Sequence, residues 1–153
     1  MVLVKSGVVN SGWSKRVVYL STCLSYNLCM VGKLESPYVK RLKKLAFRLG
    51  FVPCENERYG GGHYLPDLVW KKDNKTVGFE VESGEVVGKK VAGDAFWLYR
   101  TFDIGFIQIV NTKEFKRFEK LIRYLNSDFK NKVYVISTDL EKVETILKAK
   151  SLL

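Results

Sequence analysis

The sequence is poor in the residue types that build disulfide frameworks and structural zinc sites. It has three cysteines (Cys23, Cys29 and Cys54), no CxxC pair and one histidine, His63. A structural zinc site usually needs four Cys or His ligands at close spacing, so this composition argues against one. The odd cysteine count argues against a disulfide framework and favours a reducing, cytoplasmic compartment, although a Cys23–Cys29 bridge stays open.

Long apolar runs are also missing. Residues 17–31 are moderately apolar, but Ser, Thr, Asn and Tyr interrupt them. The segment is therefore too short and too polar to span a membrane. No small-residue cleavage site follows a continuous apolar run, which argues against a signal peptide. We expect short strands in this segment and no membrane partner.

Acidic residues are outnumbered. There are 26 Lys and Arg against 16 Asp and Glu, a formal net charge of +10. Because neutralising phosphates releases condensed counterions, this balance favours a nucleic-acid partner. A Lys-rich surface that only maintains solubility, or a basic surface for an acidic protein, would have the same composition.

The pattern of apolar residues predicts an α/β fold in this chain of 153 residues. We expect helices over residues 36–49, 85–100, 112–125 and 139–150, and strands over 51–58, 65–71, 76–82, 104–110 and 133–137. Ser36, Thr112 and Asp139 are the expected N-caps, and Gly50 ends the first helix. This order predicts a central mixed β-sheet flanked by helices on both sides. Residues 1–33 would be an N-terminal extension of short strands packed on a domain at 34–153.

A predicted β-hairpin carries the most informative acids. Side chains alternate along a strand, so Glu80 and Glu82 share one face, and Asp67 lies opposite them in the middle of the facing strand. Three converging carboxylates are costly unless a cation neutralises them, and Mg²⁺ or Mn²⁺ is the natural one. Such an ion would lower the pKa of a bound water and stabilise charge on a phosphate. The alternative is a solvated strand face balanced by nearby lysines.

Pro66-Asp67 followed by Glu80-Val81-Glu82 resembles the two motifs of the PD-(D/E)XK nuclease superfamily, which includes restriction endonucleases and archaeal Holliday-junction resolvases. The resemblance covers about residues 36–138. It implies a restriction-endonuclease-like core, metal-dependent cleavage of duplex or branched DNA, and a homodimer. It also implies that Asp67 and Glu80 are the metal ligands.

Glu82 departs from the family pattern, which usually has Lys at this position. Some members take the lysine from the next helix, where Lys89 and Lys90 lie, with a slight preference for Lys90. Glu82 and one of these lysines would then position water or stabilise charge. The departure leaves open a non-catalytic nucleic-acid-binding module on the same fold.

Further residues close in sequence to the motifs are candidate phosphate contacts. They are Arg58, His63, Lys71, Lys72 and Arg100. Glu35 precedes the first helix, where many relatives carry another acidic ligand, although an acid is also favourable at a helix N-terminus. Residues 60–62, three glycines, lack the Lys and Ser/Thr of a phosphate-binding P-loop and predict a mobile loop near the substrate.

Overall fold

The computed structural model describes residues 36–84, 88–118, 121, 124, 127, 129 and 131–153. The strands expected in residues 1–33, the Cys23–Cys29 bridge and the acidic ligand Glu35 lie outside the described residues. The same holds for residues 85–87 at the expected start of the second helix, and for most of residues 119–125.

The elements follow the predicted order of helix, three strands, helix, strand, helix, strand and helix. The helices are α2 (Pro37–Arg48), α3 (Gly88–Thr101), α4 (Thr112–Arg117) and α6 (Leu140–Ala149), with a short 3-10 turn, η1 (Gly60–Gly62). The strands are β1 (Val52–Cys54), β2 (Leu68–Lys72), β3 (Lys75–Glu82), β4 (Ile104–Ile109) and β5 (Val133–Ile136). They form one mixed sheet in the order β1-β2-β3-β4-β5, antiparallel from β1 to β3 and parallel from β3 to β5. The predicted α/β class is confirmed.

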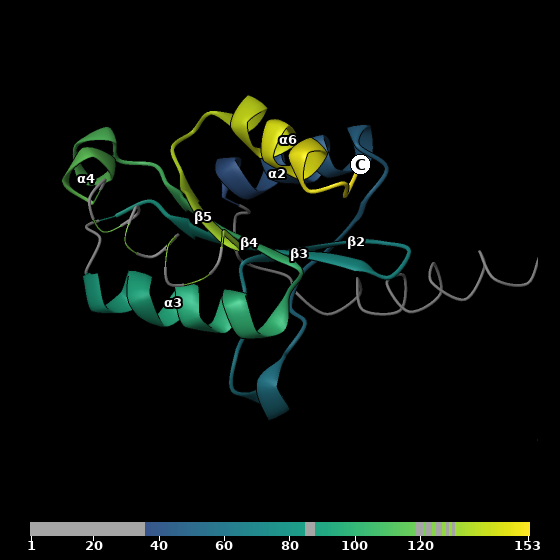
Figure 1. Cartoon of the computed structure of the whole chain (residues 1–153), viewed down its shortest axis with the longest axis horizontal. Helices are drawn as coiled ribbons and strands as arrows, with labels where there is room; N and C mark the ends of the chain where they lie inside the picture. Colours follow the sequence, from purple (N-terminus) through teal and green to yellow (C-terminus); the bar gives the residue numbers. More distant parts are fainter. Residues whose placement is uncertain are drawn as a thin grey trace, which may run out of the picture. The chain divides into compact units, whose positions relative to one another are not determined.

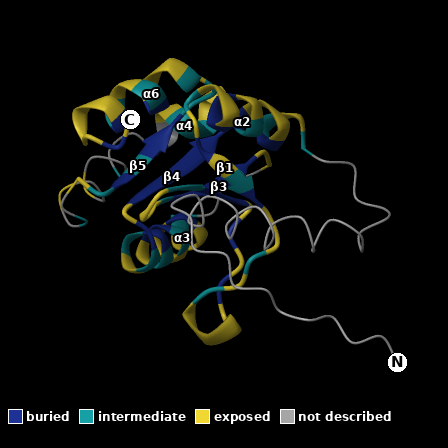
Figure 2. Ribbon diagram, turned by 90° about the vertical axis from the view of Figure 1, so that its right-hand side faces the viewer, coloured by how far each residue is buried: buried dark blue, intermediate teal, exposed yellow. Residues whose placement is uncertain are grey.

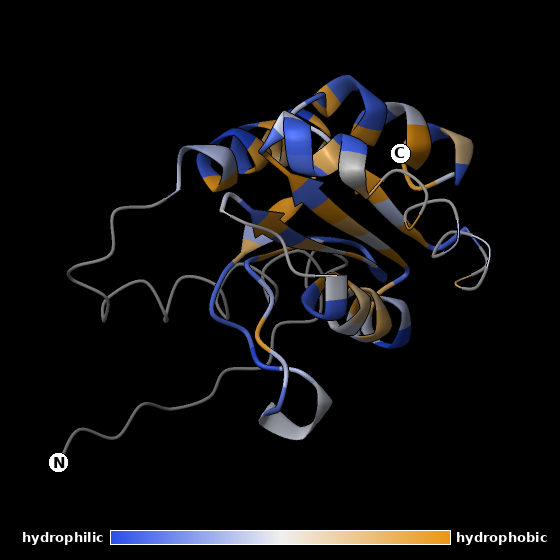
Figure 3. Ribbon diagram, turned by 90° about the vertical axis from the view of Figure 1, so that its left-hand side faces the viewer, coloured by the Kyte–Doolittle hydropathy of each residue, from blue (hydrophilic) through white to orange (hydrophobic). Residues whose placement is uncertain are grey.

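Helices cover both faces of the sheet. Figure 1 shows α2 and α6 on one face and α3 on the other. Val39 and Leu42 of α2 and Leu147 of α6 belong to one apolar core, and Val91 and Leu98 of α3 belong to the other. Buried residues follow the strands and the inner sides of the helices, whereas the outer sides of the helices are exposed and hydrophilic (Figures 2 and 3). Within the described part of the chain, no helix is long and apolar enough to cross a membrane.

Ser36 is the N-cap of α2 as predicted, but its side chain makes no capping hydrogen bond. Two other helix ends agree with the sequence and one differs. Gly50 follows α2 with a φ of 78°, and the Asp139 side chain accepts a hydrogen bond from the Glu141 N–H at the start of α6. The prediction that Thr112 caps α4 is wrong. Asn111 is the cap, because its side-chain oxygen accepts from the backbone of the second and third helical residues.

Two strand predictions are also corrected. The strand expected at residues 51–58 is only Val52–Cys54, because its pairing with β2 ends there and Asn56 takes a left-handed backbone with a φ of 59°. Asp67 lies in the bend before β2 rather than in the middle of a strand. The tight turn at Asp73 and the hairpin partnership of β2 with β3 are confirmed.

A pair of glycines lets α3 approach the sheet closely. Gly78 of β3 is in register with Gly105 of β4. A Cβ atom at Gly78 would lie 2.2 Å from the ring of Phe102, and one at Gly105 would lie 2.5 Å from Cβ of Leu98. The absence of both side chains therefore sets how near α3 comes to the face that carries Glu80 and Glu82.

We expect Gly78→Ala to lower the free energy of unfolding by about 3 kcal/mol, because the new methyl group must displace a buried ring and a leucine. The corresponding fall in melting temperature is about 6–12 °C for a domain of this size. Gly93→Ala is the matched control. Gly93 is an exposed residue of α3, and a Cβ atom there would have nothing within 4 Å of it, so its replacement should stabilise the helix. Thermal unfolding of both variants checks the sign of each change.

Candidate active site

Glu80 and Glu82 are buried at the end of β3, on the face covered by α3. Each is only 7% exposed, so the alternative of a solvated strand face is wrong. Asp67 lies beside them, because its Oδ2 accepts a hydrogen bond from the Val81 N–H at 2.7 Å. The carboxylate of Asp67 thus takes the place of a strand carbonyl just before β2 begins. The structure therefore brings the three predicted acids to one region.

Glu80 has an unusual protonation equilibrium. Burial raises its pKa to about 8; a hydrogen bond from Tyr64 opposes this rise, and the charges of Asp67 and Asp94 add to it. The Tyr64 hydroxyl donates to Oε1 of Glu80 at 2.7 Å, and burial keeps the phenol pKa far above its usual value. Without a cation, Glu80 is therefore largely protonated at neutral pH.

Lys90 is the lysine that the fold brings to the acids. It lies in the first turn of α3 and forms an ion pair with Oε1 of Glu82. Partial burial alone would lower the pKa of Lys90, but the hydrogen bond and charge of Glu82 raise it overall. Lys89 is exposed and, among the described residues, has no side-chain ion pair or hydrogen bond. The choice left open by the sequence is resolved in favour of Lys90 as the partner of Glu82.

Asp94 is a fourth acid in this region that sequence reasoning missed. It lies one helical turn after Lys90 on α3, and its Oδ2 atom is buried with no hydrogen-bond partner within the described residues. Burial raises its pKa to about 6; Lys90 opposes the rise, and the charges of Glu82 and Asp67 add to it. The signal was the spacing of four residues from Lys90, which places both side chains on one helix face.

Tyr64 was also missed, and it is positioned by the glycine turn. Where a mobile loop was expected, η1 is closed by hydrogen bonds from the Tyr59 N–H to the Tyr64 carbonyl at 2.8 Å and from the Tyr64 N–H to the Tyr59 carbonyl at 3.1 Å. The Tyr64 ring stacks on Trp97 of α3 with centroids 5.5 Å apart. Gly60, with a φ of 57°, packs so closely on Trp97 that a Cβ atom would lie 2.6 Å from the indole ring. The turn thereby fixes the hydroxyl that meets Glu80.

Two predicted phosphate contacts lie at the opposite end of the hairpin from the acids. Lys71 forms an ion pair with Glu57 at 2.6 Å. The Nζ atom of Lys72 lies 3.4 Å from the Leu49 carbonyl and 5.3 Å above the ring of Phe51. The structure therefore does not gather these two lysines around the carboxylates.

The other three predicted phosphate contacts are not buried. Arg58 donates to the Gly62 carbonyl at 3.1 Å, and His63 follows the same turn. Both are therefore near Tyr64 in the chain. Arg100 lies in the last turn of α3, about 15 Å along the helix axis from Lys90.

The donor chemistry of this region fits a hard divalent cation, but the side chains are not yet arranged around one. No group of three or more His, Cys, Asp or Glu residues in the described ranges is placed to hold a metal ion. Two of the four acids are held by Lys90 and Tyr64. The Oδ2 atom of Asp94 has no hydrogen-bond partner among the described residues, and burial followed by the charges of Asp67 and Asp94 raises the pKa of Glu80. A cation would relieve both features. Side-chain rotation would be required to form a site.

The fold and this region define an α/β protein with four carboxylates and one lysine at the end of its central strand. No family model matches the chain, and no curated protein or solved structure matches it. The function must therefore be argued from the residues themselves.

We expect the metal-free protein to lose stability as the pH rises from about 5 to about 8. The pKa of Glu80 rises from an ordinary 4.5 to about 8 on folding, so the folded state binds the proton more tightly. That stabilisation is complete below pH 4.5 and is lost as the pH passes through 8, with a slope of up to about 1.4 kcal/mol per pH unit. Urea unfolding in EDTA at several pH values measures this change in the free energy of unfolding. Glu80→Gln should flatten the curve, and parallel curves for the two proteins would contradict the assignment.

Proposed function

We propose that this protein is a metal-dependent nuclease that hydrolyses DNA phosphodiester bonds. Asp67 and Glu80 would hold Mg²⁺ or Mn²⁺. The observation that carries the proposal is the burial of Glu80 and Glu82, each 7% exposed, within reach of further acids on a basic chain. Burying several carboxylates together destabilises a fold, so the presence of the cluster favours a role in chemistry.

The resemblance to PD-(D/E)XK nucleases supports the same proposal. Asp67 precedes the first strand of the hairpin, Glu80 and Glu82 end the second, and a helix follows on the same face. We infer that the five-strand sheet is a restriction-endonuclease-like core on this basis. Lys90 would supply from α3 the positive charge that the family motif usually places at the position of Glu82.

The proposed mechanism gives a task to Glu80, Tyr64, Glu82 and Lys90. A bound divalent cation would stabilise charge on the phosphate and lower the pKa of a water molecule. Glu80 must release its proton to become a ligand, and Tyr64 fixes the orientation of the carboxylate. Lys90, held by Glu82, provides a cation for the charge that develops on the phosphate.

A non-catalytic nucleic-acid-binding module is the second candidate. It is favoured by Glu82 at the usual lysine position and by the lack of a ready metal-binding group among the described residues. This candidate predicts salt-sensitive affinity for DNA that survives chelation of metal, because phosphate contacts alone would drive binding.

Incubation of the purified chain with supercoiled plasmid, linear duplex and a four-way DNA junction tests the proposal. We expect cleavage of at least one substrate with Mg²⁺ or Mn²⁺ and none with EDTA. Failure to cut any of them with either metal would overturn the nuclease proposal. Binding without cleavage would support the second candidate, whereas no affinity for DNA even at low salt would reject both.

A further inference from the structure

Helix α2 carries a concentration of positive charge that the proposed catalytic site does not use. Five of its twelve residues are cations and none is acidic. The cations are Lys40, Arg41, Lys43, Lys44 and Arg48. Its buried stripe, which includes Leu42 and Leu45, faces the sheet, so the cations lie on the remaining surface.

Only part of this charge is neutralised within the molecule. Lys43 forms an ion pair with Glu55, and Arg48 forms one with Glu144 at 2.9 Å. Lys40, Arg41 and Lys44 are exposed and have no ion pair among the described residues. Unpaired cations on one helix face attract a polyanion more strongly than the same number scattered over the surface.

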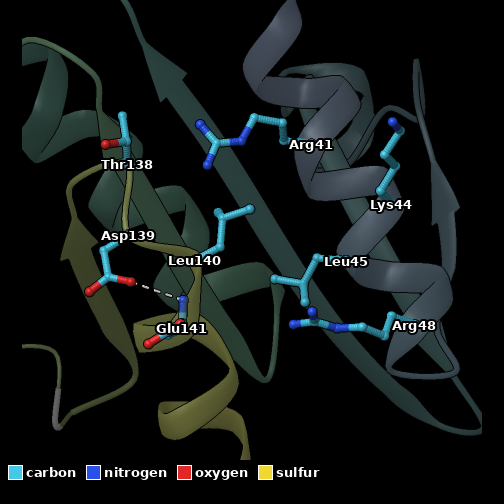
Figure 4. A pocket seen from close by; sticks show the side chains of 8 residues that line it. All are labelled: Arg41, Lys44, Leu45, Arg48, Thr138, Asp139, Leu140 and Glu141. Carbon is cyan, nitrogen blue, oxygen red and sulfur yellow. Dashed lines mark hydrogen bonds between the residues drawn. The ribbon is translucent and has the colours of Figure 1, made fainter.

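A groove beside α2 lies between this helix and the residues that follow β5. Figure 4 shows Arg41 extending across the groove towards Thr138 and Asp139. Thr138 follows the end of β5, and the parallel register puts that end at the same edge as Glu82. The two strand ends are separated by two strand spacings, about 10 Å.

The opposite wall of the groove carries negative charge. Asp139 and Glu141 line it at the start of α6. These two acids would repel an anionic chain from the groove. The chain would instead follow the outer side of α2, where Lys40 and Lys44 are exposed. This restricts the inferred surface to the helix itself.

An exposed aromatic residue shares that outer side. Phe47 is 68% exposed and lies three residues after Lys44 and seven after Lys40, which places the three side chains along one stripe. Cations that follow a backbone, together with an aromatic ring on which a base stacks, are the usual means of binding single-stranded nucleic acid. In a duplex the base faces are already stacked, so an exposed ring has less to bind.

We propose that the outer side of α2, formed by Lys40, Lys44 and Phe47, binds a single-stranded segment of DNA. This inference rests on the proposed function in one respect, because the bound DNA is taken to be part of the nuclease substrate. Lys40 and Lys44 are one helical turn apart, and the stripe from Lys40 to Phe47 is about 10 Å long. The segment would then continue round the sheet edge towards Glu82.

Fluorescence anisotropy with a labelled 20-nucleotide oligothymidylate and a 20-base-pair duplex tests this inference. All titrations contain EDTA, which prevents metal-dependent cleavage, and cover a range of salt concentrations. We expect Lys40→Gln/Lys44→Gln to weaken oligothymidylate binding by about tenfold or more, and to reduce the salt slope by about 1.4. We expect Phe47→Ala to weaken it by about fivefold or more while changing duplex binding by less than about twofold.

The matched control is Lys75→Gln/Lys150→Gln, which removes the same charge from exposed positions at the start of β3 and after α6. We expect it to change affinity by less than about twofold. Equal losses for the two double variants would overturn the inference, as would an unaltered affinity for Phe47→Ala. Every substituted side chain is exposed, so each variant should unfold at nearly the wild-type temperature. Thermal unfolding verifies this.

The inference and the proposed function fail in different ways. Impaired binding by the α2 variants in a protein that never cuts DNA would support this surface and reject the nuclease. Cleavage by a protein whose affinity for single-stranded DNA does not depend on α2 would support the nuclease and reject this surface.

Discussion

Glu80→Gln is expected to reduce Mg²⁺-dependent DNA cleavage by about 10³-fold or more, equivalent to about 4 kcal/mol of transition-state stabilisation. Glutamine has the shape of glutamate and can still accept the hydrogen bond from Tyr64, but it does not provide the negative charge that a divalent cation requires. The loss should therefore come from metal binding rather than from disruption of the fold. Initial rates of plasmid nicking at several Mg²⁺ concentrations measure it.

Two further measurements separate a metal ligand from a structural residue. Glu80→Gln should be at least as stable as the wild-type protein in EDTA at pH 8, because it no longer buries a carboxyl group that ionises with difficulty. It should also lose the stabilisation that Mg²⁺ confers on the wild-type protein. Glu141→Gln, an exposed substitution at the start of α6, is the control for removal of one negative charge. Wild-type cleavage rates for Glu80→Gln would disprove the assignment.

Lys90→Ala is expected to lower cleavage by about 10²-fold, whereas Lys89→Ala should lower it by less than about threefold. Only Lys90 is paired with Glu82, and removal of one group that stabilises developing charge typically costs about 10²–10³ in rate. The two lysines are adjacent in sequence and both exposed at the residue level, so the comparison controls for net charge and helix propensity. Single-turnover cleavage by the two variants gives the ratio directly.

An exchange of the two charges makes the same test more demanding. Glu82→Lys/Lys90→Glu keeps an ion pair between β3 and α3 but returns the lysine to the usual position of the family motif. We expect the exchanged protein to cut DNA within about tenfold of the wild-type rate, and Lys90→Glu alone to be inactive because it adds a fifth acid beside Glu82 and Asp94. Equal activities for Lys89→Ala and Lys90→Ala would remove Lys90 from the mechanism.

Much of the fold follows from local pattern. The apolar stripe of α2, the wholly buried run of β4 and the hairpin turn at Asp73 each depend on residues close together in the chain. The 3.6-residue period of α2, the continuous apolar run of β4 and the turn residues are therefore visible in the sequence. The wrong predictions concern the ends of helices and strands, where one hydrogen bond or one backbone angle decides which residue is the last. Asn111 in place of Thr112 as a cap, and the short β1, are of this kind.

The sequence by itself determined which acids share a strand face. Alternation puts Glu80 and Glu82 together, and the hairpin sets Asp67 opposite them. Only the tertiary structure decided that these acids are buried, that Lys90 rather than Lys89 meets them, and that Asp94 and Tyr64 join them. These contacts depend on the rotation of α3 and on its approach over Gly78 and Gly105, and no local pattern encodes either. Strand alternation is a property of neighbouring residues, whereas the partners of a side chain depend on how separate elements pack.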